Sequence, residues 1–327
     1  MKEICLLIPE VNLKPVNLFG AIEIFERAND YFTGQGMPPY YDVKLVGYNA
    51  SQSVLHAQIN MQTVLPVESV SAPHLIIIPS MNIGSDLSGA NNQLLLHWIV
   101  QQYHAGAEIA SLCDGAFFLA ATGLLDGKEC AAHWKSESLF TRLYPRTKLH
   151  IGKIMTDANG IYTSGGGFTS LNLILYFIEK FNGREAAVYC SKLLELDINR
   201  HSQAPFVLFE AQKQHDDEDI KKVQMYIEQH VQEKFSIDEL AVLFNISRRS
   251  FIRRFRQATN NSPFEYIQRI KIEAAKRQFE QARSSVNEVM YSVGYTDLKA
   301  FRTVFKKITG LSPIDYRNRY NKDFREV

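Results

Sequence analysis

Residues 285–316, SVNEVMYSVGYTDLKAFRTVFKKITGLSPIDY, repeat the pattern of residues 236–266, SIDELAVLFNISRRSFIRRFRQATNNSPFEY. The offset between the two copies is 49 residues at the start and 50 further on, because one residue has been added in between. A repeat of this length indicates one structural unit present twice. The aligned residues are Ser236 with Ser285, Glu239 with Glu288, Phe255 with Phe305, Pro263 with Pro313, and Tyr266 with Tyr316.

Each copy contains the signals of two helices joined by a tight turn. It opens with Ser-x-x-Glu, in which the hydroxyl and the carboxylate satisfy the first free amides of a helix. A short break follows about two helical turns later, at residues 245–246 and 294–295. A new cap, Ser247 in one copy and Thr296 or Asp297 in the other, then begins a helix with many Arg and Lys residues. The sequence therefore predicts two helix-turn-helix units.

The two basic helices have comparable faces. A major groove about 12 Å wide accepts one helix, whose side chains at i, i+3 and i+4 reach the base edges. Phenylalanines on the opposite faces are expected to dock each helix on its own unit. Since one turn of DNA is about 34 Å, we expect the two helices to enter successive major grooves on one side. The residues predicted to read bases are Arg249, Ile252 and Arg253, then Lys299, Arg302 and Thr303.

Charge separates this part from the rest of the chain. The net charge is +1, but from Ile220 onward there are 21 Lys and Arg against 12 Asp and Glu, a net of +9. The preceding residues hold 15 basic and 23 acidic side chains, a net of −8. Only the C-terminal part is therefore electrostatically suited to a polyanion. With its two helix-turn-helix units, this predicts binding to double-stranded DNA.

The C-terminal hundred residues resemble the DNA-binding domain of the AraC/XylS family. The resemblance covers about residues 219–320 and includes the family's strongest signature, VGYTDLKAFRTVFKKITGLSPIDYR. It implies a sequence-specific transcription regulator in which the six residues named above occupy base-reading positions.

The first 203 residues show a different pattern. Short apolar runs such as ICLLIP, HLIIIP and EIASLC alternate with helical patterns, which indicates a parallel sheet covered on both faces. We predict an α/β domain at 1–203 with a flavodoxin-like parallel sheet and helices on both faces. A linker is predicted at 204–218, because the stretch AQKQHDDEDIKK at 211–222 is polar and without apolar periodicity, and an all-α tandem helix-turn-helix domain follows at 219–327. At 327 residues and 46% hydrophobic, the chain is long and apolar enough for such a division.

Cys113 lies where the apolar run EIASLC passes into a helical pattern. That is the strand-to-helix turn of a nucleophile elbow, where a helix N-terminus would favour a thiolate. His133 is twenty residues later, a candidate base or ion-pair partner, and Asp114 is adjacent to the cysteine. The sequence leaves a reactive pair and a purely structural pair as alternatives. The four cysteines form no CxxC pair, so each is expected to be reduced and buried.

Residues 1–203 resemble the PfpI protease-like branch of the class I glutamine amidotransferase superfamily. The segments that carry the resemblance are LFGAIEIFERAN, SLCDGAFFLAATGLLDGKECAAHW, IYTSGGGFTSLNLILYFIEKFNGREAA and RHSQAPF. Together with an AraC-type domain, they resemble the GlxA-type regulators. In enzymes of the superfamily, the elbow cysteine works with a nearby histidine, an acidic residue and a glycine-rich loop. Here Asn17 replaces the acid, and Ser80 and Met81 replace the glycines, which weakens catalysis more than it weakens a pocket.

Two classes of function are therefore kept. In the first, the protein is not an enzyme, and the α/β domain senses a small molecule, serves as a homodimer platform, or both. In the second, Cys113 retains amidase, hydratase or glyoxalase-like activity. In a variant of the first class, oxidation of Cys113 is the signal that the protein senses. That variant needs an exposed Cys113 thiol of low pKa.

No cofactor and no metal are predicted, since His150, His201 and His215 show no ligand spacing. The start of the chain lacks the apolar core and cleavage site of a secretory signal, and no stretch approaches about 20 apolar residues. We therefore expect a cytoplasmic protein with no membrane association.

Overall fold

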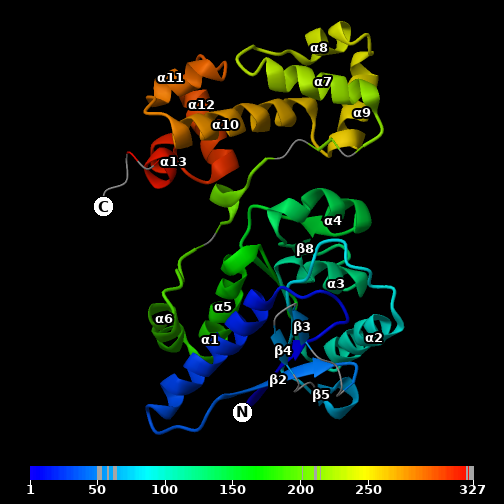
Figure 1. The fold of residues 1–327 in the computed structure, drawn as a ribbon, viewed down its shortest axis with the longest axis vertical. Helices are drawn as coiled ribbons and strands as arrows, with labels where there is room; N and C mark the ends of the chain where they lie inside the picture. The colour runs from blue at the N-terminus through cyan, green and yellow to red at the C-terminus, as the bar shows by residue number, and fades with distance from the viewer. Residues whose placement is uncertain are drawn as a thin grey trace. The chain divides into compact units, whose positions relative to one another are not determined.

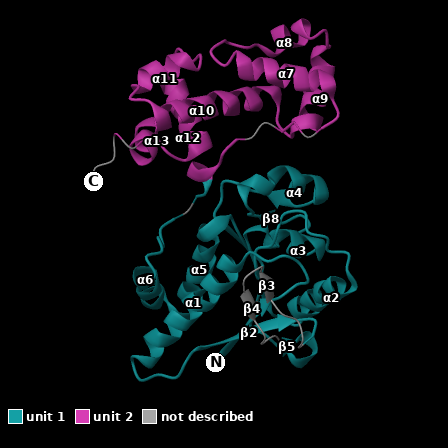
Figure 2. Cartoon of the chain, in the orientation of Figure 1, with its two compact units in different colours: residues 1–203 teal, residues 204–327 magenta. Residues whose placement is uncertain are grey.

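The computed structural model describes residues 1–49, 54–56, 59–61, 65–200, 202–209, 212, 213, 215–321 and 323. It divides the chain into two compact units, Met1–Gln203 and Ala204–Val327 (Figure 2). Each unit has hydrophobic clusters of its own, one in the first unit and two in the second.

A seven-stranded sheet forms the centre of the first unit, in the order β10-β11-β7-β6-β1-β2-β5. Neighbouring strands are parallel except for β10 and β11, which pair antiparallel at one edge. The small pairs β3–β4 and β8–β9 lie outside this sheet. The strands are β1 (Lys2–Leu7), β2 (Tyr41–Gly47), β3 (Val54–His56), β4 (Ile59–Met61), β5 (Leu65–Pro66), β6 (Leu75–Ile78), β7 (Glu108–Leu112), β8 (Glu129–Cys130), β9 (Lys148–Leu149), β10 (Met155–Ala158) and β11 (Ile161–Ser164).

Helices cover both faces of the sheet, with α1, α5 and α6 on one side and α2 and α3 on the other (Figure 1). This is why β6 is buried along its whole length and reads as a continuous apolar run. The predicted α/β class with a parallel sheet is confirmed, with the antiparallel edge strand β10 as an addition. The helices are α1 (Pro15–Thr33), α2 (Ala90–His104), α3 (Ala116–Ala121), α4 (Glu137–Leu143), α5 (Asn172–Asn182) and α6 (Arg184–Leu193).

The second unit is helical, and its described residues contain no strand. Two hydrophobic clusters lie along the long helix α10, one around Phe251 and Phe255 and the other around Phe301 and Phe305. The predicted all-α domain with two helix-turn-helix units is confirmed. Its helices are α7 (Glu218–Gln229), α8 (Ile237–Leu243), α9 (Arg248–Thr259), α10 (Pro263–Gln281), α11 (Val286–Ser292), α12 (Leu298–Thr309) and α13 (Pro313–Tyr320).

The segment 204–218, expected to be a linker, packs within the second unit where the structure describes it. The Lys276 ammonium donates to the Val207 carbonyl at 2.6 Å, and the Phe209 amide donates to Glu273 at 3.2 Å. Lys276 and Glu273 are both buried, so they require such partners. Phe209 also packs against the hydrophobic cluster around Phe251 and Phe255.

Candidate DNA-reading surface and cysteine elbow

Both predicted capping boxes are present. The Ser236 hydroxyl accepts from the Glu239 amide at 3.1 Å, and the Glu239 carboxylate accepts from the Ser236 amide at 3.1 Å. Ser285 and Glu288 make the same pair of bonds at 3.2 and 2.7 Å. The caps fix where α8 and α11 begin, and therefore where each turn must lie.

The two turns use a left-handed residue and then a second cap. Asn245 has φ +54° and Gly294 has φ +76°, values that favour Asn and Gly. Ser247 then accepts from the Ser250 amide at 3.4 Å to begin α9. In the second unit the cap of α12 is Asp297, which accepts from the Ala300 amide at 2.5 Å. Of the two candidates, Thr296 and Asp297, the structure thus selects Asp297.

The predicted reading residues lie on the outer faces of α9 and α12. Arg249 and Arg253 are exposed and Ile252 is half-buried, whereas Phe251 and Phe255 on the other side of α9 are fully buried. On α12 the corresponding Phe301 and Phe305 are fully buried. The exposed side chains of that helix include Lys299, Arg302 and Thr303. The structure therefore offers the six residues as two matching basic faces, and their contact with bases stays a prediction.

Two of these residues already make a local hydrogen bond. Arg253 donates from Nη1 to Gln257 at 3.2 Å, one turn along the exposed face of α9. The Thr303 hydroxyl donates to the Lys299 carbonyl at 2.8 Å, so it can only accept from a base, while its methyl group can contact thymine. Arg253 keeps its remaining guanidinium donors, which suit the two acceptors of a guanine edge.

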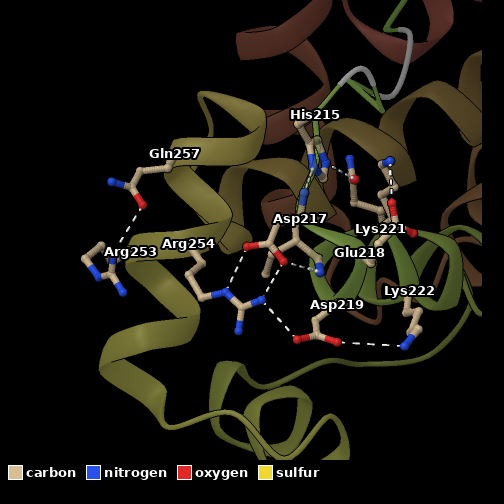
Figure 3. Close-up of polar contacts among 11 residues, drawn as sticks. His215, Asp217, Glu218, Asp219, Lys221, Lys222, Arg253, Arg254 and Gln257 are labelled. Atoms are coloured by element: carbon tan, nitrogen blue, oxygen red, sulfur yellow. Dashed lines mark hydrogen bonds and ion pairs between the residues drawn. The ribbon is translucent and has the colours of Figure 1, made fainter.

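Arg254 has a different role, which the sequence analysis missed. Its Nε and Nη2 donate to the two carboxylate oxygens of Asp217 at 2.8 and 2.6 Å, and Nη2 also reaches Asp219 at 3.0 Å. Figure 3 shows this cluster on one side of α9, with Arg253 and Gln257 on the other. The hydrogen bonds from Arg254 are the main reason that the pKa of Asp217 lies below its usual range.

Asp217 also caps α7 by accepting from the Ile220 amide at 3.2 Å, so the ion pair joins α7 to α9. This role was missed because the sequence analysis counted Arg254 only as one more basic residue. The cap at Asp217, directly before a helical pattern, is the signal that could have indicated a partner for it.

The elbow predicted at Cys113 is present in the first unit. Cys113 follows β7 with φ +55°, a conformation that is uncommon for residues other than glycine. Two residues later, a Cβ at Gly115 would lie 2.6 Å from the Ile78 and Pro79 carbonyls. Gly115 therefore allows the turn to press against the end of β6.

The environment of Cys113 favours the protonated thiol. The side chain is 1% exposed, and its sulfur lies 3.6 Å from a carboxylate oxygen of Asp114. Burial first, and the Asp114 charge second, raise the pKa of Cys113 above the usual value for cysteine. Loss of hydration and the adjacent carboxylate therefore oppose the stabilisation of a thiolate that a helix N-terminus would give, which favours the structural alternative for this pair.

Asp114 is itself fully buried and paired. The Lys14 ammonium lies 2.5 Å from one carboxylate oxygen, and the Ser136 hydroxyl donates to the other. Its partners come from the start of α1 and from the segment before α4, so the carboxylate holds three parts of the first unit together. The arrangement compensates a buried charge, and Lys14 is a member of the elbow that the sequence analysis missed.

His133 and Asn17 lie near the elbow, and each makes hydrogen bonds to different residues. His133 Nδ1 accepts from the Lys135 amide at 3.1 Å, and burial lowers the pKa of the imidazole. A Cβ at Gly166 would lie 1.9 Å from the His133 ring, so the ring packs against the glycine loop. Among the described residues, no hydrogen bond joins His133 to Cys113.

Asn17 is fully buried and donates from its amide nitrogen to the Gly167 carbonyl at 3.2 Å and to the Ser170 hydroxyl. Its amide oxygen has no donor among the described residues. Unpaired buried acceptors are uncommon and costly, so this oxygen is suited to receive a donor from a small molecule or water.

The remaining expectations concern the cysteines, metal binding and membrane spans. The cysteines are all free and buried, as expected. In the described part of the chain, no group of three His, Cys, Asp or Glu side chains is arranged to hold a metal ion, and His201 lies outside that part. The described helices include none that is long and apolar enough to span a bilayer.

Comparisons with known proteins match the two units separately. Residues 7–180 match the model of the DJ-1/PfpI family, and residues 240–319 match a helix-turn-helix domain. The chain is 27% identical over 311 residues to the HTH-type transcriptional regulator GbdR of Pseudomonas aeruginosa, covering 94% of this chain and 82% of that protein.

A second relative and a solved structure agree with this. The HTH-type transcriptional regulator GlxA of Rhizobium meliloti is 25% identical over 215 residues, which cover 65% of this chain and 66% of that protein. The crystal structure of a putative transcriptional regulator from Vibrio parahaemolyticus covers 59% of this chain and 98% of its own, with 21% identity and a TM-score of 0.51. At 21% identity, that likeness shows the fold alone.

Proposed function

The chain belongs to the DJ-1/PfpI family, and because a helix-turn-helix domain follows that family's domain, we propose that it is a sequence-specific DNA-binding transcription regulator. Its first unit senses a small molecule, provides a homodimer platform, or both, and is not an enzyme. Its second unit reads double-stranded DNA through α9 and α12.

The observation that carries the DNA-binding proposal is the pair of matching outer faces. Arg249 on α9 and Lys299 on α12 are exposed at corresponding positions, and each face carries one further exposed arginine, Arg253 on α9 and Arg302 on α12. Guanidinium and ammonium groups pair with guanine edges in the major groove and with phosphates beside it. The net charge of +9 from Ile220 onward supplies the attraction that such binding requires.

Salt dependence and selection from genomic DNA test this proposal directly. The purified protein should enrich a small set of genomic fragments, and its affinity for them should fall steeply as salt rises, since phosphate contacts release counterions. Failure to enrich any sequence, or an affinity that is indifferent to salt between about 50 and 200 mM, would contradict it.

The sensor proposal depends on the elbow. The orphan oxygen of Asn17 and the protonated Cys113 thiol give the elbow a hydrogen-bond acceptor and a polarisable group, but Asn17, which stands in place of an acid, cannot take up a proton. The elbow backbone itself favours the alternative of residual enzymatic activity, because this is the turn that enzymes use to present a nucleophile. A redox sensor is not supported, since Cys113 is buried and its pKa is raised.

Turnover and DNA binding should be measured side by side for the wild type, Cys113→Ser and Asn17→Asp. General acid-base catalysis contributes about 10²- to 10⁴-fold in rate, so little turnover is expected in its absence. We expect no amidase, hydratase or glyoxalase activity above the Cys113→Ser control, and retained DNA binding in both variants. Wild-type turnover that Cys113→Ser abolishes would make the protein an enzyme. Sedimentation equilibrium tests the homodimer.

A further inference from the structure

The hydrophobic cores of the two helix-turn-helix units meet on α10 without merging. On α10, the cluster of the first helix-turn-helix unit ends with Ile267 and the adjacent Ile270. The cluster of the second helix-turn-helix unit begins at Ile272. Between them lies Lys271, which is only 6% exposed. A buried ammonium without partners is strongly unfavourable, so its partners indicate its role.

The Lys271 ammonium donates to three backbone carbonyls that belong to both units. The Val231 and Glu233 carbonyls, at 2.6 and 2.7 Å, lie in the loop between α7 and α8 of the first helix-turn-helix unit. The Val293 carbonyl, at 2.8 Å, lies in the turn between α11 and α12 of the second helix-turn-helix unit. An ammonium has three protons, and these three acceptors match them.

The same loop and turn also touch directly. A Cβ at Gly294 would lie 2.2 Å from the Gln232 carbonyl oxygen and 2.7 Å from the Lys271 ammonium. One aromatic ring from each unit flanks the charge, with the Phe235 centroid 5.7 Å and the Tyr295 centroid 6.0 Å from Nζ. The joint between the units is therefore a close backbone contact bridged by one cation.

We propose that Lys271 is a positioning residue that holds α12 in one orientation relative to α9, so that the protein accepts its two DNA segments at only one spacing. The inference rests on the proposed DNA-reading function and adds a geometric requirement on the DNA. Without the ammonium, α10 and the contact at Gly294 still join the two helix-turn-helix units, but the bridge from the loop to the turn is lost. Each can then adjust to its own groove, at the cost of the advantage that rigid linkage gives to simultaneous binding.

The test uses the full chain and a duplex selected from a randomised library with the wild-type protein. Footprinting identifies the two segments of this duplex that the bound protein protects from cleavage. Affinity is then measured for this duplex and for versions with one or two base pairs inserted or deleted between those two segments. One inserted base pair rotates one segment by about 34° relative to the other. For the wild type we expect an affinity loss of about tenfold or more. For Lys271→Met we expect this penalty to fall to about twofold, with weaker binding to the original duplex.

Lys276→Met is the matched control, since Lys276 is a second buried lysine on α10. Its ammonium bonds to the Val207 carbonyl and to Glu273 at 2.7 Å, and not to either turn. It should keep the spacing penalty of the wild type even if it is less stable. Lys271→Arg should also keep the penalty, because a guanidinium retains several donors.

Circular dichroism checks that each variant is folded. If Lys271→Met does not fold, Lys271→Gln replaces it, because the amide retains two of the donors, and an intermediate penalty is expected. A folded Lys271→Met or Lys271→Gln variant with the full wild-type penalty would overturn the proposal. Failure of the wild type to select any duplex would instead remove the proposed function on which it rests.

Discussion

Arg253 and Arg254 are neighbours in the chain with opposite surroundings. Arg253 is exposed and donates to Gln257 on the same face of α9. Arg254 is 29% exposed at its side chain and is held by Asp217 and Asp219. The helical period of 3.6 residues separates adjacent side chains by about 100°, so one arginine faces solvent and the other faces α7. The two residues should therefore respond to mutation in different assays.

Arg253→Ala should reduce the specificity of DNA binding. Loss of a guanidinium fork from a guanine edge is expected to cost about 1 to 3 kcal/mol on the selected site and to relax one base position. Lys306→Ala, an exposed residue on α12, should weaken all sequences alike. Competition binding with selected and random duplexes makes the comparison. Equal weakening of both by Arg253→Ala would show that this face of α9 does not read bases.

Asp217→Asn should weaken the second unit in a pH-dependent way. The pKa of Asp217 in the folded protein is lowered by Arg254, below an unfolded value of about 3.9. The charge pair therefore stabilises the fold above that value and loses its contribution as pH falls through the folded pKa. We expect a loss of about 1 kcal/mol in the free energy of unfolding at pH 7, and a smaller loss at pH 3.

Urea unfolding followed by circular dichroism measures this difference. Trp98 and Trp134, the two tryptophans of the chain, lie in the first unit, so their fluorescence follows that unit separately. Asp216→Asn is the matched control, because Asp216 is an exposed neighbour, and it should change little at either pH. A loss for Asp217→Asn that does not vary with pH would exclude the charge pair as its cause.

The repeat between the two helix-turn-helix units extends to the ends of α9 and α12. Thr259 and Thr309 donate to the carbonyls of Phe255 and Phe305, each at 2.8 Å. The left-handed residues that end α9 and α12 are Asn260 and Gly310. The second copy thus has glycine at both positions where the first copy has left-handed asparagine, because Gly294 likewise corresponds to Asn245. At Gly294, packing against the Gln232 carbonyl also excludes a Cβ.

Replacing each glycine by the asparagine of the first copy should separate backbone conformation from packing. Asparagine tolerates a positive φ, so Gly310→Asn, at an exposed position, should change stability by a few tenths of a kcal/mol. Gly294→Asn introduces a Cβ against the Gln232 carbonyl and should cost about 1 to 3 kcal/mol. Thermal unfolding of the two variants decides. Equal stability would mean that the joint between the units is loosely packed.

The charge division of the chain and the packing of 204–218 determine where the chain can be cut. The contacts of Val207 and Phe209 with α10, and of Asp217 with α9, all lie on the C-terminal side of Gln203. The DNA-binding unit is therefore complete from Ala204 and not from Asp219, where the sequence alone places its start.

A fragment of residues 204–327 should fold and bind the selected duplex with a steep salt dependence. A fragment of residues 219–327 leaves Arg254 without Asp217, and Lys276 and Glu273 without their backbone partners. Its melting temperature should be lower by about 4 to 8 °C or more, since the loss exceeds about 1 kcal/mol. Identical melting curves for the two fragments would show that 204–218 contributes no stability.

Much of this protein follows from local signals in its sequence. Capping boxes, the turn at Gly294, the 3.6-residue spacing of Phe301 and Phe305, and the alternation of apolar runs with helical patterns act over a few residues. They predicted the parallel sheet, both helix-turn-helix units and the outer faces of α9 and α12, because secondary structure and amphipathic faces depend on near neighbours. The elbow at Cys113 was predicted on the same basis, from a strand that passes into a helix.

Tertiary structure alone decided how charges are used. Lys271 looks like an ordinary basic residue in a helix, yet it bonds to carbonyls 40, 38 and 22 residues away. Arg254 bonds to Asp217, 37 residues earlier, and the Lys14 ammonium pairs with Asp114 across 100 residues. The raised pKa of Cys113 likewise results from burial. A charge is costly to bury unless the fold supplies a partner, and that partner is brought close only when distant elements pack.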